Sequence, residues 1–157
     1  MFKSRVNDCS MQVLSTQINS SLKAIAYKLY KSCVGPEKYL TIPFTYIHKR
    51  ALSNFRCSSH NLMIEKGRHM NIDRDYRFCR FCLRNGVYVV ENELHFLLIC
   101  PLYASVRAKH FRPEWTRRVI CEDLFVQIMS DERDESLYSL ARYIEESFTL
   151  RESVINV

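Results

Sequence analysis

The chain has 157 residues, of which 47% are hydrophobic, and a formal net charge of +6. This length and apolar content allow a folded domain with a sizeable core, and they exclude a disordered chain. Because only three glycines and four prolines interrupt the sequence, we expect mainly α-helical structure. No apolar run reaches the roughly 18–20 residues of a membrane span, and no signal-peptide core follows the N-terminus. We therefore expect an intracellular protein that has no membrane partner.

Two helices are predicted in residues 1–70, which we expect to form a basic helical lobe. The first covers residues 8–34, where apolar residues recur every three or four positions. These apolar positions are Leu22, Ile25, Ala26, Leu29 and Cys33. The second helix follows Pro43, because proline is favoured in a first helical turn. Its predicted apolar stripe consists of Phe44, Ile47, Ala51, Leu52 and Phe55.

Cys57 and His60 follow the second predicted helix as a Cys-x2-His pair. Such a pair can supply two ligands to a metal ion. The alternative is that His60 forms a local hydrogen bond that stabilises a turn. The sequence leaves both interpretations open.

Arginine alternates with aromatic residues over residues 73–84. The arginines are Arg74, Arg77, Arg80 and Arg84, and the aromatic residues are Tyr76, Phe78 and Phe81. Single-stranded nucleic acid is commonly bound by this combination, because guanidinium groups pair with phosphates while bases stack on aromatic rings. The alternative is that the aromatic rings belong to the core and the arginines only border it.

Residues 71–112 contain the strongest chemical signal, a cysteine and histidine pattern made of Cys79, Cys82, His95 and Cys100. Three thiols and one imidazole at this spacing can enclose one zinc ion. All four positions would then be filled by protein, which leaves none for a catalytic water, so we expect a structural zinc and no enzyme. A redox Cys-x2-Cys pair and ordinary buried cysteines are the alternatives.

The zinc-binding module is predicted to contain a short β-hairpin. Asn85-Gly86 is typical of a hairpin turn, and the β-branched and aromatic residues from 87 to 90 favour a strand. A helix is predicted to begin near Asn92. In an ideal helix Cys100 lies about 140° around the axis from His95, so both can face one ion only if the helix is distorted between them. Pro101 gives a reason for that distortion.

Residues 113–157 are predicted to form C-terminal helices that pack on the body. The apolar stripe of the last helix is Leu137, Leu140, Ala141, Ile144 and Phe148. The predicted fold is therefore mainly α, with several helices packed around a small zinc-stabilised β-hairpin and helix unit. Charge is divided along the chain: residues 1–118 contain 20 Lys and Arg against eight Asp and Glu, a net +12, whereas residues 119–157 have a net −6. The basic part suits RNA or DNA, and the acidic last helix could instead bind a protein partner.

An ordered series of short motifs resembles the C-terminal region of non-LTR retrotransposon reverse transcriptases. The series is Lys38-Tyr39-Leu40, Arg50-x-x-x-Asn54-Phe55-Arg56, His60-x-Leu62-x-Ile64-Glu65-x-Gly67-Arg68, the Cys79/Cys82 pair, Glu91-x-Glu93-x-His95-Phe96 and Cys100-Pro101-Leu102-Tyr103. The resemblance covers about residues 20–152. In that family a zinc-binding module follows the polymerase and is thought to hold element RNA and target DNA.

This resemblance implies that Cys79, Cys82, His95 and Cys100 are zinc ligands. It also makes six arginines candidate nucleic-acid contacts: Arg56, Arg68, Arg74, Arg77, Arg80 and Arg84. The chain has no Tyr/Phe-x-Asp-Asp polymerase motif and no endonuclease segment. We therefore expect a detached fragment of such an element, or a host gene derived from one, that does not polymerise DNA. The alternatives are a zinc-stabilised protein-interaction module and a degenerate remnant without a selected function.

Overall fold

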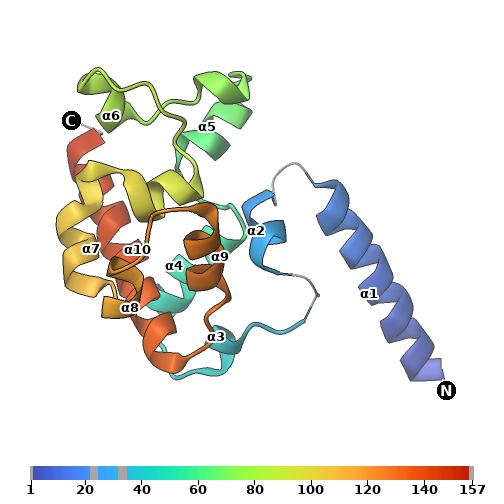
Figure 1. Ribbon diagram of the computed structural model, residues 1–157. Helices are drawn as coiled ribbons and strands as arrows, with labels where there is room; N and C mark the ends of the chain where they lie inside the picture. Colours follow the sequence, from blue (N-terminus) through green and yellow to red (C-terminus); the bar gives the residue numbers. More distant parts are fainter. Residues whose placement is uncertain (1, 22–24, 32–34, 156–157) are drawn as a thin grey trace.

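The computed structural model describes residues 2–21, 25–31 and 35–155, and these are mainly helical, as predicted (Figure 1). The first helices are α1 (Phe2–Ser20), α2 (Ile25–Tyr30), α3 (Lys38–Thr41), α4 (Tyr46–Arg56) and α5 (Met63–His69). The middle of the chain forms the 3-10 turn η1 (Arg74–Tyr76), α6 (Arg80–Arg84), the π-helical turn η2 (His95–Ile99) and the 3-10 turn η3 (Pro101–Tyr103). The last helices are α7 (Ala104–His110), α8 (Pro113–Thr116), α9 (Glu122–Ser130) and α10 (Asp134–Ile155). None of the described helices combines the length and apolar character needed to cross a membrane.

The single helix predicted for residues 8–34 is wrong. α1 ends at Ser20, and α2 is a separate helix that packs against α9, while α1 stands away from the body in Figure 1. The Nζ of Lys28 in α2 donates to the carbonyl oxygens of Asn19 and Ser21, at 2.7 and 2.8 Å. A lysine thus satisfies carbonyls at the end of α1. Of the predicted stripe, Ile25 and Ala26 are half-buried and Leu29 is exposed, whereas Leu22 and Cys33 lie outside the described residues.

α4 begins later than predicted, at Tyr46, because Thr45 provides the N-cap. The Thr45 hydroxyl oxygen accepts a hydrogen bond from the backbone N–H of His48 at 3.3 Å. Leu52 and Phe55 are buried as predicted, but Ile47 is 59% exposed. The buried face of α4 therefore lies to one side of the predicted stripe.

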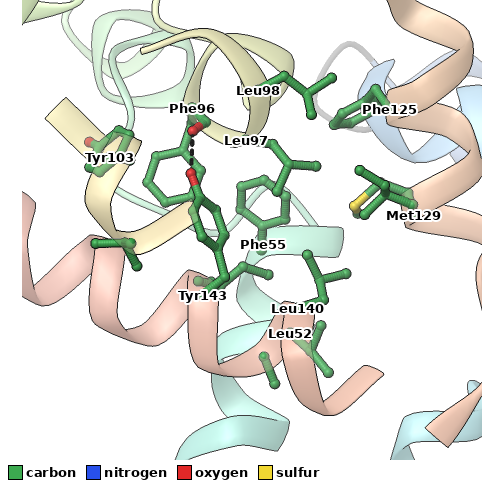
Figure 2. Packing of buried hydrophobic residues seen from close by; sticks show 14 of the residues in the cluster. Leu52, Phe55, Phe96, Leu97, Leu98, Tyr103, Phe125, Met129, Leu140 and Tyr143 are labelled. Carbon is green, nitrogen blue, oxygen red and sulfur yellow. Dashed lines mark hydrogen bonds between the residues drawn. The ribbon is translucent and has the colours of Figure 1, made fainter. Parts of the chain in front are cut away.

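α10 is the central helix, and it packs against α4, α6 and α7. Four predicted stripe residues are buried, namely Leu137, Leu140, Ala141 and Ile144, and Phe148 is half-buried. One hydrophobic core joins residues from all three predicted segments of the chain (Figure 2). The acidic last helix thus turns its apolar face to its own core.

Phe96, in the π-helical turn, lies at the centre of the aromatic core (Figure 2). Its ring centroid lies 4.6 Å from that of Tyr103, 4.7 Å from that of Phe148 and 5.4 Å from that of Phe55. The hydroxyl of Tyr143 in α10 donates to the Phe96 carbonyl oxygen at 2.7 Å. This bond satisfies a carbonyl near the end of a helix, where an intrahelical partner is missing. The core therefore fixes the position of the turn that begins with His95.

The predicted β-hairpin is wrong, although its turn is present. Gly86 has a φ of +77°, a left-handed conformation suited to glycine. No strand forms in the described part of the chain, where only one isolated antiparallel bridge, between Phe78 and Val90, takes its place. The reason is that residues 80–84 form the helix α6, which leaves too little extended chain to pair with residues 87–90.

Candidate metal centre and basic surface

Cys79, Cys82, His95 and Cys100 come together in the structure and are all buried. One ligand atom from each residue lies within 4.8 Å of the ligand atoms of the other three. Cys79 precedes α6 and Cys82 lies within it, so one helical turn directs both thiols to the same side. His95 and Cys100 approach from η2, which is separate in sequence.

The distances between the four donors fit a tetrahedral zinc site. The Sγ of Cys79 lies 3.8 Å from that of Cys100, and the Sγ of Cys82 lies 3.9 Å from it. The Cys82 Sγ lies 3.5 Å from the His95 Nε2. Around a zinc ion, two sulfurs lie about 3.8 Å apart, and a sulfur and a nitrogen about 3.6 Å apart, as the usual bond lengths and tetrahedral angles require. A disulfide would need an S–S distance of about 2.0 Å, so these are thiols.

The electrostatics of the three thiols also favour a cation between them. Cys100 donates a hydrogen bond to the Cys79 sulfur, which lowers the pKa of Cys79 to about 4. Burial, and then the charge on Cys79, raises the pKa of Cys82 to about 11. The hydrogen bond with Cys79 and burial also raise the pKa of Cys100. One thiolate can thus exist among these buried groups without a metal, whereas three require a positive ion.

The distortion predicted between His95 and Cys100 is confirmed, and it takes the form of a π turn. The Cys100 N–H donates to the His95 carbonyl oxygen at 2.8 Å, five residues back along the chain. Five residues therefore complete about one turn, which places the two side chains on the same side of the helix. Cys100 itself is extended, with a φ of −56° and a ψ of 123°, as a residue before Pro101 prefers.

Polar groups around the centre hold its ligands in place. Asn92, near which a helix was predicted to begin, caps that helix, because its Oδ1 accepts from the His95 N–H at 2.8 Å. Arg107 donates to the Cys100 carbonyl oxygen at 2.6 Å. The backbone N–H groups of Cys82 and Leu102 face the sulfurs of Cys79 and Cys100, and each lowers the pKa of the thiol that it faces. These groups belong to α6, η3, α7 and the segment before η2, and the spacing of the ligands in the sequence does not show that they meet at the cluster.

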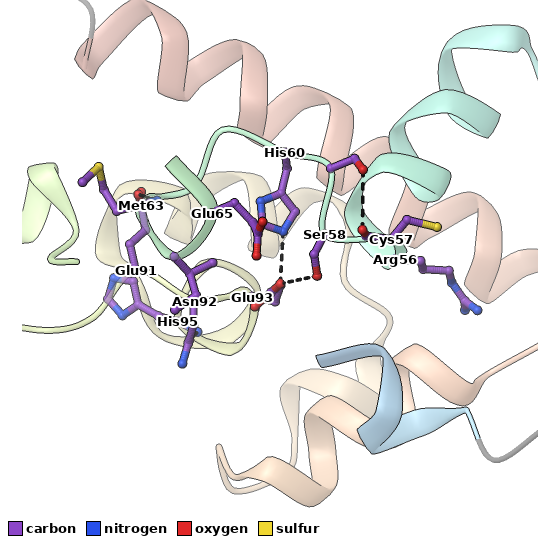
Figure 3. Close-up of polar contacts among 12 residues, drawn as sticks. Arg56, Cys57, Ser58, His60, Met63, Glu65, Glu91, Asn92, Glu93 and His95 are labelled. Atoms are coloured by element: carbon purple, nitrogen blue, oxygen red, sulfur yellow. Dashed lines mark hydrogen bonds and ion pairs between the residues drawn. The ribbon is translucent and has the colours of Figure 1, made fainter. Parts of the chain in front are cut away.

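The structure does not place Cys57 and His60 with the metal ligands. His60 Nε2 lies 3.2 Å from the Glu93 Oε1, which also accepts from the Ser58 hydroxyl at 3.0 Å (Figure 3). Cys57 is exposed and is not part of the ligand cluster. His60 therefore forms a hydrogen bond, as in the second interpretation, but the bond is not local, because its partner Glu93 lies 33 residues away in sequence.

Arg56 is not a surface contact, which corrects its prediction as a nucleic-acid ligand. The residue is only 3% exposed. Its guanidinium donates to Glu37 at 2.7 Å and to the Met129 carbonyl oxygen at 2.5 Å, and it lies over the ring of Tyr30. The guanidinium group of Arg56 is thus surrounded by other parts of the protein and is not accessible to nucleic acid, because it lies on the face of α4 that points towards the core.

Arg77 and Arg68 are also engaged within the protein. Arg77 donates to the carbonyl oxygens of Ile64 and Ile72 at 2.8 and 2.9 Å. Arg68 pairs with Glu65 at 2.9 Å and is half-buried. Arg77 thereby ties the segment that follows α5 back to α5 through backbone carbonyl oxygens, and we assign it a structural role.

Gly67 gives a test of that role, because a methyl group there would meet Arg77. A Cβ built at Gly67 lies 2.7 Å from the Arg77 Cγ. We expect Gly67→Ala to lower the free energy of unfolding by about 1–3 kcal/mol, as overpacking does, although alanine normally favours a helix over glycine by ~1 kcal/mol. Urea denaturation measures the change. Gly35→Ala is the control, since nothing lies within 4 Å of its Cβ position, and an equal effect at both positions would contradict the packing argument.

Arg74, Arg80 and Arg84 differ from Arg56 and Arg68, because none of the three takes part in an ion pair in the described ranges. Arg77 forms no ion pair there either, but two backbone carbonyl oxygens hold its guanidinium group. Arg74 and Arg84 are exposed and Arg80 is half-buried. They lie on η1 and α6, beside the cysteine pair. Together with Arg77, these three of the six predicted contacts keep guanidinium charge that no described carboxylate neutralises, and Arg84 also donates to the Val154 carbonyl oxygen at 3.0 Å.

An aromatic surface adjoins these arginines. Tyr76 is 66% exposed and Tyr88 is 74% exposed. The half-buried ring of Phe78 lies between them, edge to face, with centroid distances of 6.1 Å to Tyr76 and 5.6 Å to Tyr88. The sequence indicated Tyr76 but gave Tyr88 only as a strand residue. Its role at the surface depends on the chain reversal at Gly86, which brings residue 88 back to residue 78.

No protein-family model matches the chain, and no curated protein or solved structure does either. The resemblance to non-LTR retrotransposon reverse transcriptases therefore stays a prediction. What the chain can do has to be argued from the cluster and the surface beside it.

Proposed function

We propose that this chain is a non-catalytic module that binds single-stranded RNA or DNA, and that one structural zinc ion maintains its shape. The observation that carries the proposal is a surface made of exposed Tyr76, Tyr88, Arg74 and Arg84 and half-buried Phe78 and Arg80, which we call the aromatic–arginine surface. It lies directly beside the cysteine pair. A detached C-terminal piece of a retrotransposon polyprotein, as the motif series suggests, would have this activity without a polymerase.

The chemistry of the surface matches a single strand better than a duplex. Exposed tyrosine rings offer faces on which unpaired bases can stack, and stacking tolerates any base. Unpaired arginines beside them can neutralise phosphates, with release of counterions. A duplex would keep its bases stacked on each other and could not use the rings.

Zinc would supply a cross-link and no reaction chemistry. Cys79, Cys82, His95 and Cys100 would fill all four positions, so no water could be activated on the ion. The cross-link joins α6, which carries Arg80 and Arg84, to η2, which is fixed in the core. The basic surface would in this way be held on a short helix of five residues that could not be stable alone.

Replacement of Tyr88 tests the proposal. We expect Tyr88→Ala to weaken binding of a labelled oligouridine by about 5- to 150-fold, the equivalent of the ~1–3 kcal/mol that one stacked base contributes. Fluorescence anisotropy titrations measure the affinity. Tyr46→Ala is the matched control, because Tyr46 is 76% exposed, much like Tyr88, but lies on α4 and is not part of the aromatic–arginine surface.

Salt dependence provides a second readout. The affinity for oligouridine should fall linearly on logarithmic axes as salt increases, and Arg80→Ala should reduce that slope. If neither single-stranded RNA nor DNA binds, or if Tyr88→Ala and Tyr46→Ala behave alike, the proposal is wrong. A protein-interaction module would then be preferred, although the apolar stripe of α10 is buried and offers no surface for docking.

A further inference from the structure

A cavity of about 270 Å³ lies between α2, α5, η1 and α9, next to the aromatic–arginine surface. Ala26, Leu29 and Phe125 form part of an apolar wall. Its volume approaches the ~300 Å³ at which small-molecule sites begin. The cavity adjoins the aromatic–arginine surface directly, because Arg74 lines it and Tyr76 ends the same 3-10 turn. Arg74 therefore belongs both to the cavity and to the aromatic–arginine surface.

The charged groups of the cavity have opposite signs, and this restricts what can enter. Three carboxylates line it: Glu65 and Glu93, both labelled in Figure 3, are only 6% and 7% exposed, and Glu122 is exposed. Three arginines line it as well, of which Arg68 pairs with Glu65 and Arg77 donates to two backbone carbonyl oxygens. Arg74 is exposed and makes no ion pair with the acidic side chains that the structure describes. Deep in the cavity a free phosphate would meet the two buried carboxylates, Glu65 and Glu93, and a lysine or arginine side chain would be repelled by the three arginines of the lining. A neutral, donor-rich ring attached to an anionic group would satisfy both.

A nucleotide is such a ligand. Its base is planar and uncharged, so it can lie against the apolar wall, while its phosphate stays at the mouth beside Arg74. A carboxylate accepts hydrogen bonds only, so it selects a base edge that presents N–H donors. Guanine presents two adjacent donors, N1–H and the N2 amine, on its Watson–Crick edge. Adenine, cytosine and uracil cannot offer a carboxylate two adjacent donors.

We propose that this cavity receives one guanine base from a single strand that lies across Tyr76 and Tyr88, with Glu65 as an acceptor for the base. This inference rests on the proposed function, since it assumes that the strand is bound. Glu65 has capacity for it, because both hydrogen bonds from Arg68 go to its Oε2 and leave Oε1, whose two lone pairs can accept N1–H and the N2 amine together. Bases turned out of a stack are held in pockets of this kind, between apolar groups and hydrogen-bonding side chains.

The test compares three labelled nine-residue RNAs that differ only at the central base. Eight positions are uridine, and the centre is uridine, guanosine or inosine. We expect the guanosine RNA to bind about tenfold more tightly than the inosine RNA, because inosine lacks the N2 amine and forfeits one charge-assisted hydrogen bond. Fluorescence anisotropy gives all three affinities with the same protein.

Two variants separate the cavity from the surface. Glu65→Gln should bring the guanosine-to-inosine ratio close to one without weakening the binding of the uridine RNA, and the matched charge control Glu132→Gln, at an exposed position, should leave the ratio unchanged. Ala26→Phe should fill the cavity and abolish the guanosine preference, with circular dichroism as the check that the chain is folded. Binding of all three RNAs with equal affinity overturns this inference alone. Absence of any binding overturns the proposed function as well.

Discussion

Chelation of the proposed zinc ion is expected to abolish cooperative thermal unfolding of the chain. Structural zinc binding contributes on the order of 10 kcal/mol in finger-sized sites, which is comparable to the total stability of a domain, about 5–15 kcal/mol. Without the ion, three buried thiols would remain with no group to replace it, and α6 would lose its link to η2. The measurements are the zinc content of the purified protein and thermal melts by circular dichroism with and without chelator.

A matched pair of cysteine variants provides the control. Cys100→Ser removes a ligand and should prevent stoichiometric zinc binding, whereas Cys121→Ser replaces an exposed cysteine at the start of α9 and should bind zinc normally.

Proton release on zinc binding is an additional readout. Cys79 has a pKa of about 4, while the pKa values of Cys82 and Cys100 are raised, so binding at pH 7 should release about two protons from thiols. Zinc affinity should therefore increase with pH, and a protein that lacks zinc and still melts cooperatively would refute the site.

Arg151→Met is expected to lower the free energy of unfolding by about 3–5 kcal/mol, because it leaves a buried carboxylate without its partner. Arg151 in α10 donates to both oxygens of Glu91, at 3.0 and 2.8 Å, and the two side chains are 6% and 1% exposed. Glu91 also accepts from the Met63 N–H at 2.7 Å through its side chain and from the Ile64 N–H at 3.0 Å through its carbonyl oxygen. One carboxylate thus connects α10 to the start of α5 and to the segment before His95.

Arg142→Met is the appropriate comparison for this prediction. Arg142 lies on the same helix, is exposed and takes part in no ion pair within the described ranges, so its replacement should change the free energy of unfolding by less than about 0.5 kcal/mol. Both variants remove one positive charge, which makes their difference independent of net charge. Urea denaturation of the two proteins gives that difference directly. A similar small effect at both positions would mean that Glu91 is solvated and that the buried pair contributes little.

The sequence alone determined the features that depend on local spacing. The ligand set was predictable, because Cys79 and Cys82 at i and i+3 share a face in any tight turn, whatever the rest of the chain does. The stripe of α10 was predictable because a helix that packs on a core repeats its apolar residues every three to four positions. The need for a distortion between His95 and Cys100 followed from helical geometry, although its form as a π turn did not.

Only the tertiary structure decided which polar groups are used within the protein and which remain available. Arg56 and Arg74 are the same residue type in similarly basic surroundings, yet Arg56 is enclosed by Glu37 and the Met129 carbonyl, while Arg74 is exposed. Likewise, His60 bonds to Glu93, 33 residues away in sequence. Such partners depend on how helices that are distant in sequence pack together. The free-energy cost of leaving a polar group without a hydrogen bond arises only where that packing buries the group. The spacing of residues in the sequence therefore predicted the candidate metal centre, whereas the packing of the helices decided which arginines and aromatic rings remain exposed beside it.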